Sequence, residues 1–92
     1  MIKNFKHKGL ELFFIKDDRR LLDKKQLPKI NRILELLDTI QDIQDLNISG
    51  YGLHPLTGNR KGTWSVKVNG NWRITFEFEK GNALNINLED YH

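Results

Sequence analysis

Residues 63–90 of the sequence read TWSVKVNGNWRITFEFEKGNALNINLED, and apolar side chains occupy alternate positions in three successive runs. A period of two is typical of strands with one apolar face. Asn69-Gly70-Asn71 and Gly81-Asn82 separate the three runs, and both have the composition of hairpin turns. The region therefore predicts a three-stranded antiparallel meander whose apolar face must be covered by other elements.

Two amphipathic helices are predicted ahead of this meander. Residues 6–16 place apolar side chains at helical spacing, and a longer apolar stripe runs from Leu27 to residues 39–41. Pro28 falls in the first turn of the second helix, where it is tolerated. The sequence therefore predicts one α+β domain over residues 1–92, in which two N-terminal helices pack on one face of a small, twisted, mainly antiparallel sheet.

Three shorter elements complete the prediction. Residues 1–5 alternate weakly and indicate a short strand, and residues 43–46 indicate one helical turn. Pro55 and the glycines after it limit any strand that begins at Leu53 to a few residues. A Gly- and Pro-containing loop then leads into the meander.

The composition excludes several classes of protein. The 92 residues include no cysteine, which removes disulfide scaffolds, thiolate zinc sites and cysteine nucleophiles. No GxGxxG motif or P-loop indicates a nucleotide cofactor, and the three histidines lack metal-ligand spacing. No apolar run approaches roughly 18 residues, and the first residues lack the apolar stretch of a signal peptide. We therefore expect a cytoplasmic protein with no membrane partner, metal or cofactor.

Charge is distributed unevenly along the chain. The net charge is +3, but residues 1–32 hold ten Lys or Arg against four Asp or Glu. Residues 33–59 hold four Asp or Glu and no Lys or Arg. A basic third beside an acidic segment suits contact with a polyanion such as nucleic acid. The alternative is that these charges only solvate the helices.

One face of the predicted sheet carries polar side chains. If the helices cover the face of Ile74, alternation puts Arg73 on the opposite face and Lys67 beside it on the neighbouring strand. Arg60 and Lys61 in the preceding turn lie at the rim, so we predict that Arg60, Lys61 and Lys67 contact RNA. The alternative is a solvated face with a cross-strand pair of Lys67 and Glu77. By the same parity Trp64 and Trp72 are expected in the core.

Proton-active side chains follow the last predicted strand. Asp90, Tyr91 and His92 stand there, and His54 lies in the Gly- and Pro-containing loop. RNA cleavage needs a base for the 2′-hydroxyl proton, an acid for the 5′-oxygen and a cation for the phosphate, and these residues with Arg73 supply those groups. The alternative is that terminal residues are frayed and have no function.

At these residues the sequence resembles a known family, the HigB-type toxins of the RelE superfamily, also described as plasmid maintenance killer or host-inhibition proteins. The resemblance covers essentially the whole chain. The residues that carry it are Met1–Leu10, Leu53-His54-Pro55-Leu56, Trp64-Ser65-Val66, Val68–Phe76 and Glu89-Asp90-Tyr91-His92.

The resemblance implies a small α+β toxin that enters the ribosomal A site and cleaves messenger RNA there without a metal, by attack of the 2′-hydroxyl. It implies that His92 is a general acid or base flanked by Asp90 and Tyr91, that Arg73 clamps the phosphate and that His54 is a second active-site histidine. It also implies a helix-turn-helix antitoxin of the HigA type, through which alone the toxin would meet operator DNA.

One position departs from the family pattern. Many relatives carry Lys two residues after the Pro of the loop, and here that position is Thr57. Arg60 or Lys61 would have to supply the missing charge. This departure favours one alternative, a nonenzymatic binding module or decayed toxin. A second alternative also stays open, a gyrase poison of the ParE branch of the superfamily, which would not need the terminal His. The acidic segment with Asp38, Asp42 and Asp45, and the basic first helix, are candidate surfaces for the antitoxin.

Overall fold

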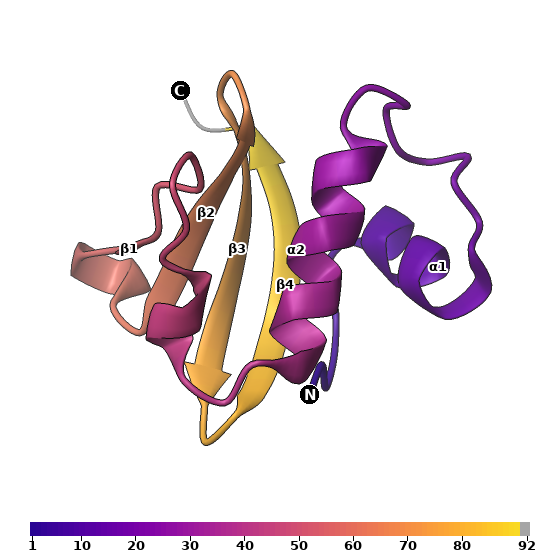
Figure 1. The fold of residues 1–92 in the computed structure, drawn as a ribbon. Coiled ribbons are helices and arrows are strands. Elements are labelled where there is room, and N and C mark those ends of the chain that lie inside the picture. The colour runs from indigo at the N-terminus through magenta and orange to yellow at the C-terminus, as the bar shows by residue number, and fades with distance from the viewer. Residues whose placement is uncertain (91–92) are drawn as a thin grey trace.

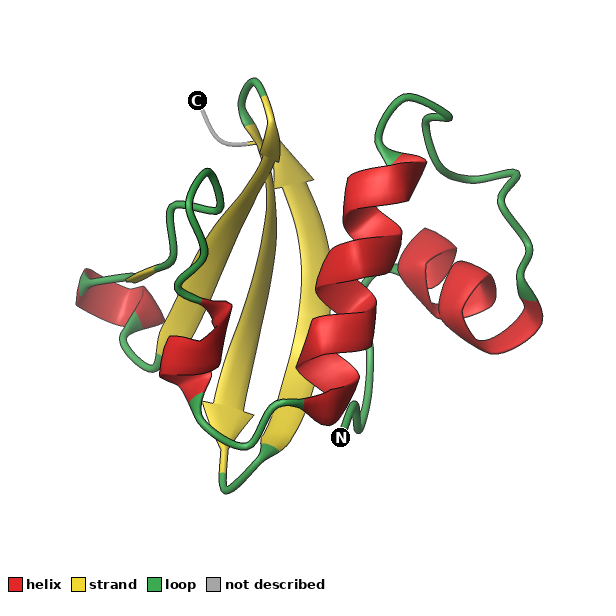
Figure 2. Cartoon of the chain, viewed as in Figure 1, coloured by secondary structure: helices red, strands yellow, loops and turns green. Residues whose placement is uncertain are grey.

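The computed structural model describes residues 1–90 (Figure 1). Loops connect the helices and strands, and the two long helices precede the sheet in the chain (Figure 2). The elements are α1 (Lys8–Lys16), α2 (Leu27–Thr39), the 3₁₀ turns η1 (Ile43–Leu46) and η2 (Gly58–Arg60), and strands β1 (His54–Pro55), β2 (Thr63–Asn69), β3 (Trp72–Glu79) and β4 (Asn82–Asp90).

The sheet has the strand order β1-β2-β3-β4, and every neighbouring pair is antiparallel. The predicted meander is confirmed as β2, β3 and β4, and β1 extends it on one side. The segment predicted as a strand at residues 1–5 forms two isolated parallel bridges to β4 instead, Ile2 to Ala83 and Phe5 to Ile86. The N-terminal segment therefore lies along the outer edge of the last strand.

The two helices form where their sequences predict them. The His7 side chain caps α1 by accepting a hydrogen bond from the Leu10 amide at 3.2 Å, and Asp17 ends the helix in the left-handed conformation with φ 54°. Pro28 lies in the first turn of α2, where no intrahelical N–H is needed. No helix within residues 1–90 is long and apolar enough to cross a bilayer.

A single apolar core lies between the helices and one face of the sheet, which we call the inner face. α1 and α2 gather on the β4 side of the domain, while β1 and η2 lie beside β2 (Figure 1). The core residues are Leu10, Phe13, Ile30, Ile33, Leu34, Leu37, Ile40, Leu46, Val66, Val68, Ile74, Phe76, Ala83, Ile86 and Leu88. Their burial explains the α+β architecture, because each helix stripe meets the apolar face of the meander.

A bulge in β4 changes the predicted alternation. Thr75 pairs with Asn87 and Glu77 pairs with Leu84, so one residue of β3 faces two of β4. Asn85 takes the positive φ of 53° that the bulge requires. The alternation of the third run predicts Leu84 on the same face as Ile86 and Leu88. That prediction is wrong, and Ala83 fills the core in place of Leu84.

Trp72 lies on the face that its parity predicts but is not buried in the core. It begins β3 on the inner face, but 38% of its surface is exposed, whereas Trp64 packs against the core as expected. Trp72 lies next to the β2–β3 turn and lines a pocket with Leu22 and Gln26, which precede α2.

Candidate active site on the outer face of the sheet

The face opposite the helices, which we call the outer face, is ordered in rows by the strand register. One row, which we call the charged row, joins Lys67 on β2, Arg73 on β3 and Glu89 on β4. The neighbouring polar row joins His54, Ser65, Thr75 and Asn87 across all four strands. Because directly opposite residues share a face, the predicted residues His54, Lys67 and Arg73 come together on one surface.

Glu89 is the most strongly bound group of this face. Its two carboxylate oxygens accept hydrogen bonds from Arg60, at 2.9 Å from Nη1 and 2.6 Å from Nη2, and one of them also accepts the Thr75 hydroxyl. The Arg60 hydrogen bonds hold the pKa of Glu89 below its usual value, although partial burial acts in the opposite direction. The carboxylate is therefore fixed in its ionised form. We call this arrangement the Arg60–Glu89 clasp.

Glu89 was missed by the sequence reasoning, although a signal for it was present. It alternates with the apolar residues of β4 and has the same parity as the outward residues of β3. The clasp also changes the interpretation of Arg60, which was predicted to contact RNA. Its guanidinium is bound to a carboxylate, so part of its charge is balanced within the fold, and its contact with RNA stays a prediction.

The centre of the outer face is buried, which contradicts the expectation of an open, solvated surface. Ser65 is 0% exposed and Thr75 5% exposed. Among residues 1–90 the Ser65 Oγ has no hydrogen-bond partner. A polar cavity of 320 Å³ lies on this face, and Thr75 is part of its lining. Its lining includes Lys6, Asn59, Arg60, Thr63, Glu77, Asn85, Asn87 and Glu89.

His54 stands exposed at the edge of the outer face on β1. Its Nδ1 lies 2.9 Å from the Gly52 carbonyl oxygen, which can only accept a hydrogen bond. In the neutral ring the proton is therefore assigned to Nδ1, and Nε2 is left to accept one. From two strand spacings and one step of two residues, the Cα atoms of His54 and Arg73 are about 12 Å apart.

Arg73 is half-buried between two charged neighbours in the charged row. Lys67 lies opposite it on β2, and Glu89 on β4 is held by the clasp. The alternative cross-strand pair of Lys67 with Glu77 is wrong, because Glu77 pairs in register with Thr63. Lys61 is exposed directly after η2. Lys61 and Lys67, two of the predicted RNA contacts, are thus exposed, and Lys67 lies directly opposite Arg73.

The chain end is only partly described. Asp90 is the last residue of β4 and pairs with Trp72, so alternation assigns it to the inner face, on the other side of the sheet from Arg73. Tyr91 and His92, predicted as catalytic, lie outside the described residues. Asp90 nevertheless lies opposite Trp72, the first residue of β3, so β4 ends one register position from Arg73. Within residues 1–90 no group of three metal-ligating side chains is gathered.

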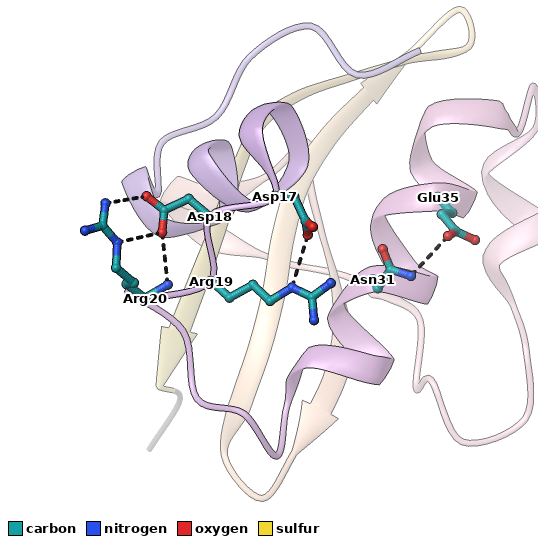
Figure 3. A network of polar contacts seen from close by, with 6 residues as sticks. All are labelled: Asp17, Asp18, Arg19, Arg20, Asn31 and Glu35. Atoms are coloured by element: carbon teal, nitrogen blue, oxygen red, sulfur yellow. Dashed lines mark hydrogen bonds and ion pairs between the residues drawn. The ribbon is translucent and has the colours of Figure 1, made fainter.

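A second polar network lies away from this face, at the connection between α1 and α2 (Figure 3). Asp18 receives two hydrogen bonds from the Arg20 guanidinium, at 3.0 Å from Nε and 2.8 Å from Nη2, and Asp17 receives one from Arg19 at 3.1 Å. The Arg20 hydrogen bonds lower the pKa of Asp18 to about 2. This network contains none of the predicted site residues.

Two of the predicted antitoxin contacts are already used within the fold. Asp38 is half-buried and accepts a hydrogen bond from the Ile2 amide at 2.9 Å. Asp42 caps η1 by accepting the Gln44 amide at 2.9 Å. The carboxylates of Asp38 and Asp42 therefore stabilise the fold of this chain, and a partner would meet groups that are already hydrogen-bonded.

Comparison with known proteins gives one family throughout. Residues 3–92 match the model of the RelE-like toxin of the type II toxin–antitoxin system HigB. The chain is 49% identical over 92 residues to a protein of Proteus vulgaris named Endoribonuclease HigB, with both chains covered completely. It is 39% identical over 93 residues to Toxin HigB-1 of Vibrio cholerae, covering 99% of this chain and 98% of that one.

Solved structures agree on the fold. A YafQ mutant from E. coli superposes with a TM-score of 0.61 at 17% identity, covering 98% of this chain and 91% of the other. The YoeB–YefM complex from Staphylococcus aureus gives a TM-score of 0.59 at 19% identity, covering 100% and 95%. The α+β fold with helices on one sheet face is thus shared with these proteins at low sequence identity.

Proposed function

The chain belongs to the HigB-like family of RelE-like toxins from type II toxin–antitoxin systems, and from that premise we propose that it cuts messenger RNA in the ribosomal A site. It is an endoribonuclease toxin, as its full-length relative of Proteus vulgaris is by name. The two other functions raised by the sequence, a nonenzymatic module and a gyrase poison, have no comparable support.

The site that we propose is the outer face at the end where β4 leads to residues 91 and 92. Arg73 binds the scissile phosphate from the charged row and stabilises the negative charge that develops on it. Lys67 and Lys61 bind neighbouring phosphates, which positions the strand. The observation that carries the proposal is that Arg73, Lys67 and His54 share this one face by strand register.

Proton transfer completes the proposed reaction. The 2′-hydroxyl attacks the adjacent phosphorus, its proton passes to a base, the bond to the 5′-oxygen breaks, and an acid protonates that oxygen. We assign these roles to His92 and to His54, whose Nε2 accepts a proton, with Asp90 and Tyr91 adjusting His92. The products are a 2′,3′-cyclic phosphate and a 5′-hydroxyl. No step uses a cofactor.

Dependence on the ribosome has a physical rationale. About 12 Å separates the Cα atoms of His54 and Arg73, so a flexible RNA strand has many bound geometries that do not react. A strand that ribosomal RNA holds in one conformation loses this freedom before the toxin binds. The proposed action lies in the cytoplasm, where translation takes place.

The toxin requires an antitoxin partner, since its family is defined by a toxin–antitoxin system. We propose a helix-turn-helix antitoxin of the HigA type, with operator DNA contacted only through it. The basic α1 and the connection after it form the more exposed of the two candidate surfaces, with Lys16 exposed and with Arg19 and Arg20 exposed although they pair with Asp17 and Asp18.

The experiment is primer extension on ribosomes programmed with a defined messenger. Wild-type protein should cut within the A-site codon only when ribosomes are present. A messenger with a single 2′-deoxy substitution at the scissile nucleotide should remain intact, because the nucleophile is gone. The variant His92→Ala should lose cleavage while it keeps its fold by circular dichroism. Cleavage of the 2′-deoxy messenger would overturn the proposed chemistry, and equal cleavage without ribosomes would overturn the ribosome dependence.

A further inference from the structure

A pair of lysines meets around Tyr51 at the edge of the sheet. The Lys29 Nζ, from the first turn of α2, lies 5.0 Å above the centre of the Tyr51 ring and donates a hydrogen bond to the Gly50 carbonyl at 3.2 Å. The Lys67 amide donates to the Tyr51 carbonyl at 2.7 Å. One short segment, Gly50-Tyr51, therefore links α2 to β2 and brings the two lysines to the same place. We call them the Lys29–Tyr51–Lys67 cluster.

The positive charge of this cluster is not balanced locally. Within residues 1–90 no carboxylate lies within ion-pair distance of Lys29 or Lys67. Partial burial, and next the nearby Lys67, lower the pKa of Lys29, so the ammonium is held where a positive charge is disfavoured. Lys67 in turn lies opposite Arg73, and like charges in directly opposite positions are destabilising. A bound anion would relieve all of these unfavourable interactions.

The cluster continues the charged row. Lys67 belongs to both, so the positive surface runs from Arg73 across β2 to the half-buried Lys29 on α2. The Gly50 carbonyl holds the amine of Lys29, and the Tyr51 carbonyl holds the backbone of Lys67. These restraints reduce the conformational entropy that is lost when the lysines contact a phosphate. Glu89, on the other side of Arg73, is already bound by Arg60 and Thr75.

We propose that Lys29, supported on the Tyr51 ring beside Lys67, binds a phosphate of the messenger strand next to the scissile one. This inference rests on the proposed function and extends its site from the sheet to α2. Lys29 was not among the residues that the sequence pattern singled out. It lies 38 positions from Lys67 in the chain, and only the fold brings the two together.

The test measures binding to ribosomes with the protein intact and the messenger blocked by a 2′-O-methyl group at the scissile nucleotide. Lys29→Gln keeps most of the side-chain stem, and its Kd should rise about fivefold, as expected for a lost phosphate contact. The slope of log Kd against log salt should fall in magnitude by about 0.7. Lys29→Arg should restore both. Lys25→Gln, an exposed lysine outside the cluster, is the matched control and should bind like wild type.

A second messenger separates the two sources of phosphate. On ribosomes whose messenger ends before the A-site codon, wild type and Lys29→Gln should bind equally, because the proposed contact is absent. The same fivefold loss on this shortened messenger would assign Lys29 to ribosomal RNA and overturn the proposal. Identical behaviour of Lys29→Gln and Lys25→Gln on the full messenger would also overturn it. If wild-type protein fails to cut the unblocked messenger, the proposed function itself is wrong.

Discussion

Two ion pairs in this molecule have nearly the same chemistry and very different surroundings. Arg60 and Glu89 meet through two hydrogen bonds of 2.9 and 2.6 Å, and Arg20 and Asp18 through two of 3.0 and 2.8 Å. Arg60 and Glu89 are 29 residues apart, whereas Asp18 and Arg20 are two apart (Figure 3). The side chain of Arg20 is 87% exposed and that of Arg60 is 40% exposed.

The difference between the two pairs shows what sequence separation adds to a contact. The pair at Asp18 restrains only the connection that contains it, and water screens it more strongly through the exposed Arg20. The clasp joins η2 to β4 and adds a third partner, Thr75, from β3. It therefore holds the loop that carries Lys61 against the face that carries Arg73.

The most direct test of the comparison is whether RNA cleavage depends on Arg73, beside the clasp, and not on Arg20, in the pair at Asp18. Arg73→Ala should lower ribosome-dependent cleavage by about 10²-fold or more, because a charge positioned on the transition state is removed. Arg20→Ala removes the same side chain from the connection and should cleave like wild type. The rates follow from primer extension under single-turnover conditions. Equal losses in both variants would mean that Arg73 acts through the fold and not through the phosphate.

The energetic contrast is tested by two double-mutant cycles. The coupling between Arg60→Met and Glu89→Gln should be about 1 kcal/mol, a charge-assisted value reduced for solvent exposure. The cycle on Asp18 and Arg20 should give a smaller coupling, because the guanidinium of Arg20 is largely exposed. Urea unfolding of the four variants of each cycle supplies the numbers. A larger coupling at Asp18 and Arg20 than at the clasp would reverse the expected order of the two pairs.

Acid should weaken the clasp in a definite direction. The pKa of Glu89 is lowered in the folded protein, chiefly by the hydrogen bonds from Arg60, so its ionised form favours folding. This stabilisation is complete above the unfolded pKa of about 4.3 and is lost as the pH falls through the lower folded pKa. The difference in Tm between wild type and Glu89→Gln should therefore shrink between about pH 6 and pH 3. A difference that grows on acidification would contradict this sign.

The smallest effect is expected in the loop that the clasp holds. Thr57 is exposed and makes no capping hydrogen bond at the start of η2, so a lysine fits there without loss of structure. Thr57→Lys should raise the cleavage rate roughly twofold, the scale of one exposed charge contact. Thr57→Gln, of similar length but neutral, is the control. No gain over Thr57→Gln would show that this position does not limit the rate.

Regular periodicity explains how much of the fold followed from the sequence. The bounds of α2 and the three long strands were predicted, because apolar side chains there repeat with one period over many residues. One helical turn at residues 43–46 was predicted as well. The bulge at Asn85 was not predicted, since one extra residue in a strand leaves no mark on composition. The parallel bridges of residues 2–5 were also missed, because they depend on a contact between distant parts of the chain.

The site followed from the sequence only in its individual residues. Parity placed Arg73 and Lys67 outward, and the register confirms that they share a face. Parity could not show that Arg60 reaches Glu89, because η2 lies outside any repeating pattern. The burial of Ser65 and Thr75 was likewise hidden, since small polar residues suit a covered or a solvated strand equally well.

The contact of residues 2–5 with the edge of β4 also sets the order of events during synthesis. The bridges of Ile2 and Phe5 cannot form until Ala83 and Ile86 have been synthesised, about eighty residues later. Sheets closed by such distant contacts form slowly, because a long loop must be ordered first. Neither the N-terminal segment nor the clasp can form before β4 leaves the exit tunnel. A nascent chain whose β4 is still inside the exit tunnel therefore lacks the complete outer face on which the proposed site lies.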